Sequence, residues 1–420
     1  MQEAATVRDA GRRAFRLTLV GTLVSALGQG LTLPYLFIYL HDVLGAPLAL
    51  AGVVLAVASV VGLGATALGG SLGDRIGLGR LAWIGLLVQA AGTALLALAP
   101  HPGVAALGVA VNSVGNSLVW PALNGLVAVQ VPSAQRSRAY AMRFGVLNAG
   151  IGVGGLVSGW LVSIQHPASF HLVYAVDAGT TALFAVLILV GLRGTPGIAA
   201  TPPPKEGERP RGGYLTVLRD RAFVGYLGVA FALGVFGYAQ LVGPWAAFVT
   251  GEGGATTQVV GFAFAANTAA IVAVQLGVER ITRRTRRSRL LVATALFWAA
   301  AWGITGVAAL PAFRGPVADV GFIAALAVFG IGETFYSPVG GAMPNALAPE
   351  HLRARYNSLA ASTWPLGGFV GPPIAGALLG GALPGSWVGV ILVGTLATAL
   401  AAAVLGRRLP RGVEHPVDAS

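Results

Sequence analysis

The chain of 420 residues contains no cysteine. Disulfide bonds, thiolate nucleophiles and cysteine-ligated metals are therefore excluded. Its six histidines all fall in segments that we read as loops, tails or the ends of apolar runs, which argues against a metal site within a membrane. No loop groups a serine, a histidine and an acid as nucleophilic catalysis requires. We therefore expect no metal, no cofactor, no catalytic residues and no enzymatic activity.

Charge is scarce as well. Only 10% of the residues are charged and 55% are hydrophobic, whereas soluble domains carry about 25% charged residues. A water-soluble globule of this size cannot bury so much apolar surface, and runs of about 20 apolar residues are long enough to cross a bilayer. The first run is too long for a cleavable signal peptide, so we expect it to stay in the protein. We read twelve spans, at residues 15–40, 47–72, 80–99, 104–130, 140–163, 171–192, 222–249, 257–278, 290–310, 317–346, 356–380 and 386–406.

Lysine is nearly absent, and the net charge of +12 comes from arginine. When the chain is threaded through twelve spans with its N-terminus in the cytoplasm, Arg314 is the only one of the 27 basic residues that falls outside. This asymmetry is what the positive-inside rule requires, so the charge indicates topology and not nucleic-acid binding. Residues 280–289 carry six arginines, which we interpret as an anchor on anionic lipid headgroups or as a regulatory patch. The arginine bias favours a GC-rich bacterial genome and hence the bacterial cytoplasmic (inner) membrane, with both termini cytoplasmic.

A pattern in the second half of the chain repeats one in the first half at a displacement of 217 positions. Two homologous membrane halves are typical of secondary transporters. Residues 194–213 are rich in proline, glycine and charge, and they contain the single lysine, so we read a cytoplasmic linker there. We predict an N-terminal six-helix half at 1–192, a linker at 193–221, a C-terminal six-helix half at 222–406 and a cytoplasmic tail at 407–420. The repeated pairs are Gly115/Gly332, Pro121/Pro338, Pro132/Pro349, Arg136/Arg353 and Arg138/Arg355.

The loop after the second span reads GGSLGDRIGLGR, from Gly69 to Arg80. It resembles the G-x-L-x-D-R-x-G-[RK]-[RK] loop of the major facilitator superfamily, although Leu78 and Gly79 stand where that pattern has other residues. The resemblance implies an all-α integral membrane protein whose twelve transmembrane helices form two pseudo-symmetric six-helix halves. It also implies a cytoplasmic gate in which Asp74 engages an arginine, with a simple topology anchor as the alternative. The gate residues would be Asp74, Arg75, Arg80, Arg136 and Arg138.

A glycine ladder follows in the fifth and eleventh spans. The eleventh span resembles the GxxxGPxxGG element of proton-linked antiporters of this superfamily, where that element belongs to the fifth span. Proline bends a helix, and glycines on one face allow close helix packing. Residues 150–155 also satisfy G-x-G-x-x-G, but this segment lies in a membrane helix and not in the βαβ unit that a dinucleotide site needs. The helix-packing set is Gly150, Gly154, Gly159, Gly367, Gly371, Pro372 and Gly376.

Two acids lie at membrane depth, Glu333 in the tenth span and Asp177 in the sixth. An ionisable residue there is costly and by default suggests a function. Glu333 aligns across the repeat with Asn116, and the resemblance places the first, fourth, seventh and tenth spans around the central cavity. We therefore expect Glu333 to bind a proton or a cationic substrate, or else to serve as a structural hydrogen-bonding group. An acid at Asp177 resembles a feature of drug-efflux members, but it also suits a helix-packing role.

Polar residues of the fourth span recur at every fourth position, so they share one helical face. In lipid such amides must face protein or a wet cavity, and we expect a cavity lining or, alternatively, bonds between helices. Arg143 in the fifth span either snorkels to the surface or balances a buried acid. The candidate cavity residues are Asn112, Asn116, Trp120 and Asn124, with Gln29 of the first span and Tyr238 and Gln240 of the seventh.

These features favour a secondary transporter that exports a lipophilic or amphipathic small molecule, a drug or a metabolite, in exchange for protons. The expected partners are this substrate, protons and the lipid bilayer, with the protein working as a monomer. The alternative is a symporter or facilitator that imports a nutrient, and a membrane receptor without transport activity is a third hypothesis.

Overall fold

The computed structural model describes residues 2–132, 135–191, 214–282 and 285–414, and in a few of these the backbone alone. Within these ranges the secondary structure is helical and includes no strand, which confirms the all-α prediction. Residues 192–213, which hold most of the predicted linker, lie outside the described ranges, as does the end of the predicted tail.

Eleven helical segments of the described chain are long and apolar enough to cross a membrane. They correspond to eleven of the twelve predicted spans. The remaining predicted span, 356–380, is also helical, as part of α15 (Arg353–Leu379). Three prolines and several small polar residues lower the mean hydropathy of α15, so composition alone does not single it out as a span.

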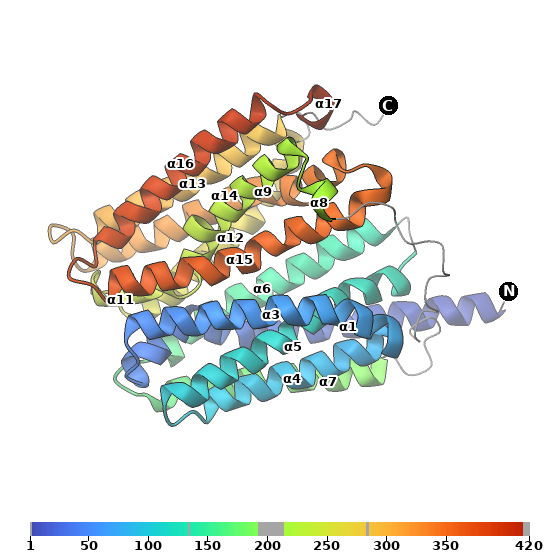
Figure 1. The fold of residues 1–420 in the computed structure, drawn as a ribbon. Coiled ribbons are helices and arrows are strands. Elements are labelled where there is room, and N and C mark those ends of the chain that lie inside the picture. The colour runs from blue at the N-terminus through green and yellow to red at the C-terminus, as the bar shows by residue number, and fades with distance from the viewer. Residues whose placement is uncertain (1, 133–134, 192–213, 283–284, 415–420) are drawn as a thin grey trace. The chain divides into compact units, whose positions relative to one another are not determined.

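The described helices divide into two compact units (Figure 1). The first comprises residues 1–46 and 57–205, and the second comprises residues 47–56 and 206–420. In the first unit, α1 packs against α6 and α7, while α4 packs against α5 and α7. The helices of this unit are α1 (Gln2–Thr32), the short turns η1 (Leu33–Tyr35), α2 (Leu36–Ile38) and η2 (Tyr39–Val43), α3 (Leu48–Ile76), α4 (Leu78–Ala97), α5 (Pro102–Gln130), α6 (Arg136–Leu161) and α7 (Ala168–Gly191). The start of α3, up to Ala56, groups with the second unit.

The second unit repeats these pairings. Its α9 and the turn after it pack against α15 and α16, and α13 packs against α14 and α16. Besides α15, its helices are α8 (Tyr214–Val217), α9 (Arg221–Leu233), η4 (Gly234–Tyr238), α10 (Ala239–Leu241), α11 (Pro244–Gly251), α12 (Thr257–Thr282), α13 (Arg287–Ala308), α14 (Pro316–Leu347), η5 (Glu350–Leu352), α16 (Ser386–Gly406) and α17 (Arg411–Glu414).

The predicted seventh span, 222–249, is interrupted. A π-helical turn, η4, follows α9, and the chain then breaks at Gly243, whose φ is +108°. Glycine populates this region at no steric cost, and Pro244 starts α11 at a position where a missing N–H does no harm. The first span is irregular too, since Pro34 follows α1 in a 3-10 turn. The apolar pattern could not show these breaks because they leave the hydropathy unchanged.

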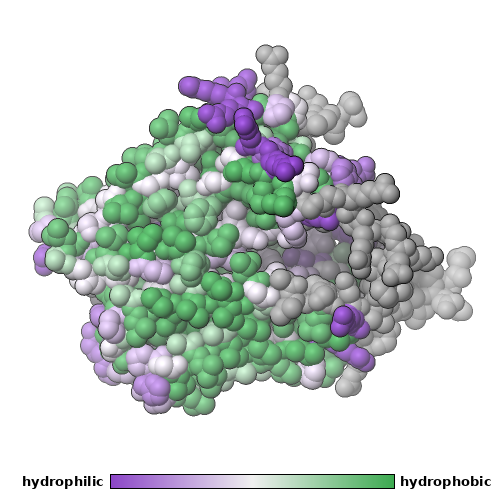
Figure 2. Space-filling model, in the orientation of Figure 1, coloured by the Kyte–Doolittle hydropathy of each residue, from purple (hydrophilic) through white to green (hydrophobic). Residues whose placement is uncertain are grey.

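Apolar side chains cover much of the face shown in Figure 2, and strongly hydrophilic ones gather towards its edges. Large apolar side chains such as Leu183, Val393 and Leu400 are exposed. Exposed apolar surface on this scale is unfavourable in water and suits contact with lipid chains. The outer helix faces therefore match the membrane environment that the composition predicts.

Candidate functional site

Glu333 lies in the middle of the longest helix of the second unit, α14. This helix starts with Gly315 at its N-cap, where φ is +66°, followed by Pro316. Pro338 lies within the same helix and has no N–H for the carbonyl of Thr334, so the backbone next to Glu333 lacks one regular helical bond. The helix sequence thus places an acid, at membrane depth, next to a point where a backbone hydrogen bond is missing.

Tryptophan and phenylalanine rings hold α14 against α13. The Trp298 indole stacks on Phe329 with ring centroids 4.5 Å apart, and its N–H donates to the Phe329 carbonyl at 3.1 Å. A Cβ at Gly332 would lie 2.6 Å from Trp298, so the close approach requires glycine there. These contacts fix the rotation of α14 and hence the direction in which Glu333 projects.

Asn267 of α12 is the hydrogen-bond partner of Glu333. Its amide nitrogen donates to a carboxyl oxygen of Glu333 at 3.0 Å and to the carbonyl of Leu326 at 3.2 Å. Glu333 is half-buried, whereas Asn267 is buried. The carboxyl group therefore has one described neutral donor, which can serve either protonation state of the acid.

Asp177 is buried in the first unit between α7 and α1. The hydroxyl of Thr32 donates to one carboxyl oxygen at 2.9 Å, while the other oxygen, Oδ1, is buried and has no hydrogen-bond partner within the part of the chain that the structure describes. Gly28 of α1 allows this approach, because a Cβ there would lie 2.7 Å from Oδ1. This acid lies at a helix interface, as the packing hypothesis expects.

Arg143 of α6 is buried and bound to α5. Its Nη1 donates to the side-chain oxygen of Asn124 at 2.6 Å, and its guanidinium lies 5.0 Å from the centre of the Trp120 ring. The hydroxyl of Tyr140 donates to the backbone carbonyl of Asn124 at 3.0 Å. The described partners of Arg143 are thus an amide and an indole. The sequence had suggested instead that this side chain reaches the membrane surface or pairs with a buried acid.

The remaining polar residues of the fourth-span stripe behave differently from one another. Asn112 donates to the hydroxyl of Thr93 on α4 at 2.8 Å, which is a bond between helices. Asn116 is exposed, as is Trp120 at 46%. The stripe therefore divides into an interhelical end at Asn112 and more open positions further along α5.

The predicted cavity residues of the first and seventh spans also separate. Gln29 is half-buried and donates to Ser25 one turn earlier at 3.3 Å. Tyr238 is 39% exposed, and its ring meets that of Trp364 edge-on at 5.1 Å. Gln240 differs from the expectation: it is 1% exposed, and it bonds to the carbonyls of Val235 and Gly371 and to the Trp387 indole. Its amide bridges the irregular part of the seventh span, at Val235, and α15, at Gly371.

Glycines of the ladder lie at close contacts between helices. A Cβ at Gly154 would be 2.9 Å from the Cα of Gly30 on α1. In the second unit, a Cβ at Gly367 would be 2.9 Å from the Cα of Gly234. The other ladder positions, Gly150, Gly159, Gly371, Pro372 and Gly376, are buried as well.

The predicted cytoplasmic gate is only partly described. Arg75, Arg80, Arg136 and Arg138 are exposed, and Arg136 donates to the carbonyl of Val131 at 3.2 Å. The Asp74 side chain lies outside the described side chains. Its contact with an arginine stays a prediction.

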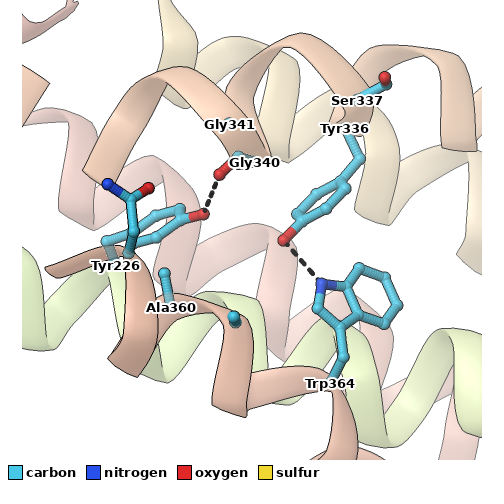
Figure 3. A pocket seen from close by; sticks show the side chains of 9 residues that line it. Tyr226, Tyr336, Ser337, Gly340, Gly341, Ala360 and Trp364 are labelled. Atoms are coloured by element: carbon cyan, nitrogen blue, oxygen red, sulfur yellow. Dashed lines mark hydrogen bonds between the residues drawn. The ribbon is translucent and has the colours of Figure 1, made fainter. Parts of the chain in front are cut away.

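An aromatic pocket of about 270 Å³ opens between α9, α14 and α15 (Figure 3). Tyr226 donates to the carbonyl of Gly340 at 3.4 Å, and the Trp364 indole donates to the Tyr336 hydroxyl at 3.2 Å. The rings of Tyr336 and Trp364 meet at 79° with centroids 5.1 Å apart. Glu333 precedes Tyr336 by three positions, so the two residues lie on neighbouring parts of one helix face.

Sequence reasoning missed Asn267 and this pocket. Asn267 is an amide in the middle of a mostly apolar predicted span, and the rule applied to the fourth-span amides would have singled it out. The pocket had no comparable signal, because its three rings come from separate spans and are individually ordinary membrane residues.

The sequence matches the profile of the Major Facilitator Superfamily over residues 18–310 and 239–419. It is 31% identical over 212 residues to the multidrug resistance protein MdtH of Yersinia enterocolitica, and 30% identical over 212 residues to that of Yersinia pestis strain Pestoides F. Each match covers 50% of this chain and 50% of the relative, so the chain spans about half the length of the curated relatives it matches.

Solved structures of peptide transporters are similar in fold. A POT family transporter in complex with 5-aminolevulinic acid has a TM-score of 0.78 at 15% identity and covers 94% of this chain and 96% of its own. A peptide transporter POT in complex with sulfate has a TM-score of 0.76 at 17% identity, with 97% and 96% covered. Identity at this level shows the fold and not the substrate. The helical pattern, the repeated packing and the profile match over almost the whole chain lead to one conclusion: this multi-pass membrane protein belongs to the Major Facilitator Superfamily of transporters.

Proposed function

We propose that this transporter exports a lipophilic or amphipathic small molecule across the bacterial cytoplasmic (inner) membrane in exchange for protons, by alternating access. Both termini would be cytoplasmic, as the arginine distribution favours. The protein would work as a monomer in the bilayer, with the Asp74 loop as the cytoplasmic gate. The multidrug resistance names of the relatives support export, over the half of the chain that they match.

The observation that carries the proposal is the environment of Glu333. The carboxyl group is half-buried at mid-helix, and its described hydrogen bond comes from a neutral amide. Moving a carboxylate out of water is costly unless it is neutralised, and a proton provides that neutralisation. Because Asn267 can remain bonded in either state, Glu333 can load and release a proton without losing its neighbour.

Inside-out membrane vesicles with an imposed pH gradient test this assignment. We expect a panel of lipophilic drugs to include compounds that dissipate the gradient with the wild type and not with Glu333→Gln. The control is Glu252→Gln, the same chemical change at an exposed acid, which should retain coupling. Full drug-dependent proton movement in Glu333→Gln would refute the proton role.

The alternative is import by symport or facilitated diffusion. Counterflow of a nutrient that persists without any pH gradient would favour that alternative over export.

A further inference from the structure

Four positions that line the aromatic pocket of the second unit have counterparts in the first unit, where four side chains contact one another. The displacement of 217 positions pairs α5 with α14 and α6 with α15. The four interlocked residues of the first unit therefore have four partners by position, and all four partners line the pocket. The pairs are Trp120/Ser337, Asn124/Gly341, Tyr140/Asn357 and Arg143/Ala360.

Side-chain volume at these four positions is larger in the first unit than in the second. In the first unit the guanidinium of Arg143 lies against the Trp120 ring and bonds to Asn124. Replacing that tryptophan, asparagine and arginine by Ser337, Gly341 and Ala360 removes an indole, an amide and a guanidinium from the same place. Ser337 and Gly341 are exposed, so this space opens at the surface of the unit.

The walls of the pocket indicate the kind of group that fits. The half-buried rings of Tyr336 and Trp364 supply aromatic surface, the buried Tyr226 lies at the wall, and the residues that line the pocket include neither an acid nor a base. Aromatic rings prefer offset or edge-to-face contact with other rings. The volume of about 270 Å³ is just below the range of about 300–1,000 Å³ for whole small-molecule sites, so the pocket holds one part of a ligand.

Hydrogen bonds and ring contacts hold the aromatic side chains of the pocket in place before a ligand binds. The Trp364 indole is oriented by the Tyr336 hydroxyl, and the Tyr238 ring meets the indole edge-on at 5.1 Å. Tyr226 is 1% exposed and is held by the carbonyl of Gly340. Side chains that are already fixed lose little freedom when a ligand binds.

We infer that the pocket formed by Tyr226, Tyr336 and Trp364 is a binding site for a planar aromatic group of a small molecule. Under the function proposed above, on which this assignment of the ligand as substrate rests, the group belongs to the exported compound. Stacking places the ring next to Trp364, and the small residues Ser337, Gly341 and Ala360 leave the space for it.

The test uses the full chain in lipid nanodiscs and the planar fluorophore ethidium as the probe, with anisotropy as the readout and empty nanodiscs as the blank. Ser337→Trp restores the residue that the first half has at this place, and it should weaken ethidium binding at least about tenfold. Leu366→Trp places the same ring at an exposed position of α15 that does not line the pocket, and it should bind like the wild type. Equal binding by Ser337→Trp and the wild type would overturn the assignment.

Two further measurements separate ring recognition from other causes. Trp364→Ala should weaken binding about tenfold, and Trp364→Phe should weaken it less, because stacking and ring area contribute to affinity. Decyltrimethylammonium, a cation without a ring, should fail to displace ethidium. Displacement by this compound at the concentrations at which ethidium binds would show that the site does not select rings. Gly341→Asn serves as the filling variant if the thermal unfolding midpoint shows that Ser337→Trp does not fold.

Failure of this assignment is distinguishable from failure of the proposed function. Proton coupling is measured on Glu333→Gln in vesicles, whereas ethidium binding is measured on the filling variants in nanodiscs. If Glu333→Gln remains coupled while the filled pocket loses ethidium, the proton role is wrong and the site stands. If ethidium binding survives in both filling variants, the site is wrong whatever the result for Glu333.

Discussion

Replacing Gly154 by alanine should destabilise the first unit by a predictable amount. The new Cβ would lie 2.9 Å from the Cα of Gly30 and would also meet the carbonyl oxygen of Leu27. Both are backbone atoms of α1, so no side chain can rotate away and the helices must separate. Overpacking of this kind costs about 1–3 kcal/mol.

The matched control is Gly145→Ala on the same helix. A Cβ at Gly145 meets nothing within 4 Å, so this variant changes only the backbone preference of the chain. Alanine is favoured over glycine inside a helix by about 0.5–1 kcal/mol, and this gain applies equally to both variants. The difference between the two variants therefore isolates the helix contact, at about 1–3 kcal/mol.

Thermal unfolding of the purified variants in detergent measures this difference. Gly154→Ala should unfold at a lower temperature than Gly145→Ala, which should match or exceed the wild type. Gly371→Ala extends the test to the second unit, where the new Cβ would be 2.7 Å from that of Ala239. Equal unfolding temperatures for Gly154→Ala and Gly145→Ala would refute the close α1–α6 contact as the reason for glycine.

Three further predictions concern buried charged groups. Arg143→Lys should lower stability by about 1–2 kcal/mol in thermal unfolding, because an ammonium cannot reproduce the planar contact with Trp120; stability equal to the wild type would contradict this. Asp177→Ala should cost about 1 kcal/mol because the buried Thr32 hydroxyl loses the shorter of its two acceptors, whereas Asp177→Asn keeps an acceptor oxygen and should unfold closer to the wild type. Glu414→Ala removes the acceptor that holds α17 on the start of α13. Carboxypeptidase digestion followed by mass spectrometry should therefore show faster loss of the C-terminal residues. An unchanged rate of loss would show that this bond does not hold α17.

Several features of the site followed from the sequence because they are local. The depth of Glu333 follows from the apolar residues on either side of it in the sequence. The repeat shows that Glu333 and Asn116 occupy equivalent positions in the two halves. The closeness of Gly154 to another helix was foreseeable because a run of small residues in a membrane span has few other uses. The choice of partner helix was not foreseeable, since glycine permits an approach from any neighbour.

Other features depended on how the helices are rotated and paired. Arg143 was expected to reach the surface or an acid, but α5 presents Asn124 and Trp120 to it instead. Gln240 was expected to line a cavity, but the interrupted backbone turns it towards carbonyls and the Trp387 indole. The first outcome depends on how a helix is rotated about its axis, and the second depends on where the helix is interrupted. Hydropathy encodes neither of these features.

The sequence by itself determined the membrane class, the number of helical segments, the two-fold repeat and the family, because span length, composition and spacing are properties of consecutive residues. The tertiary structure alone decided that Asn267 bonds to Glu333 across 66 positions and that Tyr226, Tyr336 and Trp364 surround one space. Such contacts join different helices, and they arise from the packing of whole faces against one another. Packing depends on all the side chains of both faces at once, which is why no single segment of the sequence could reveal it.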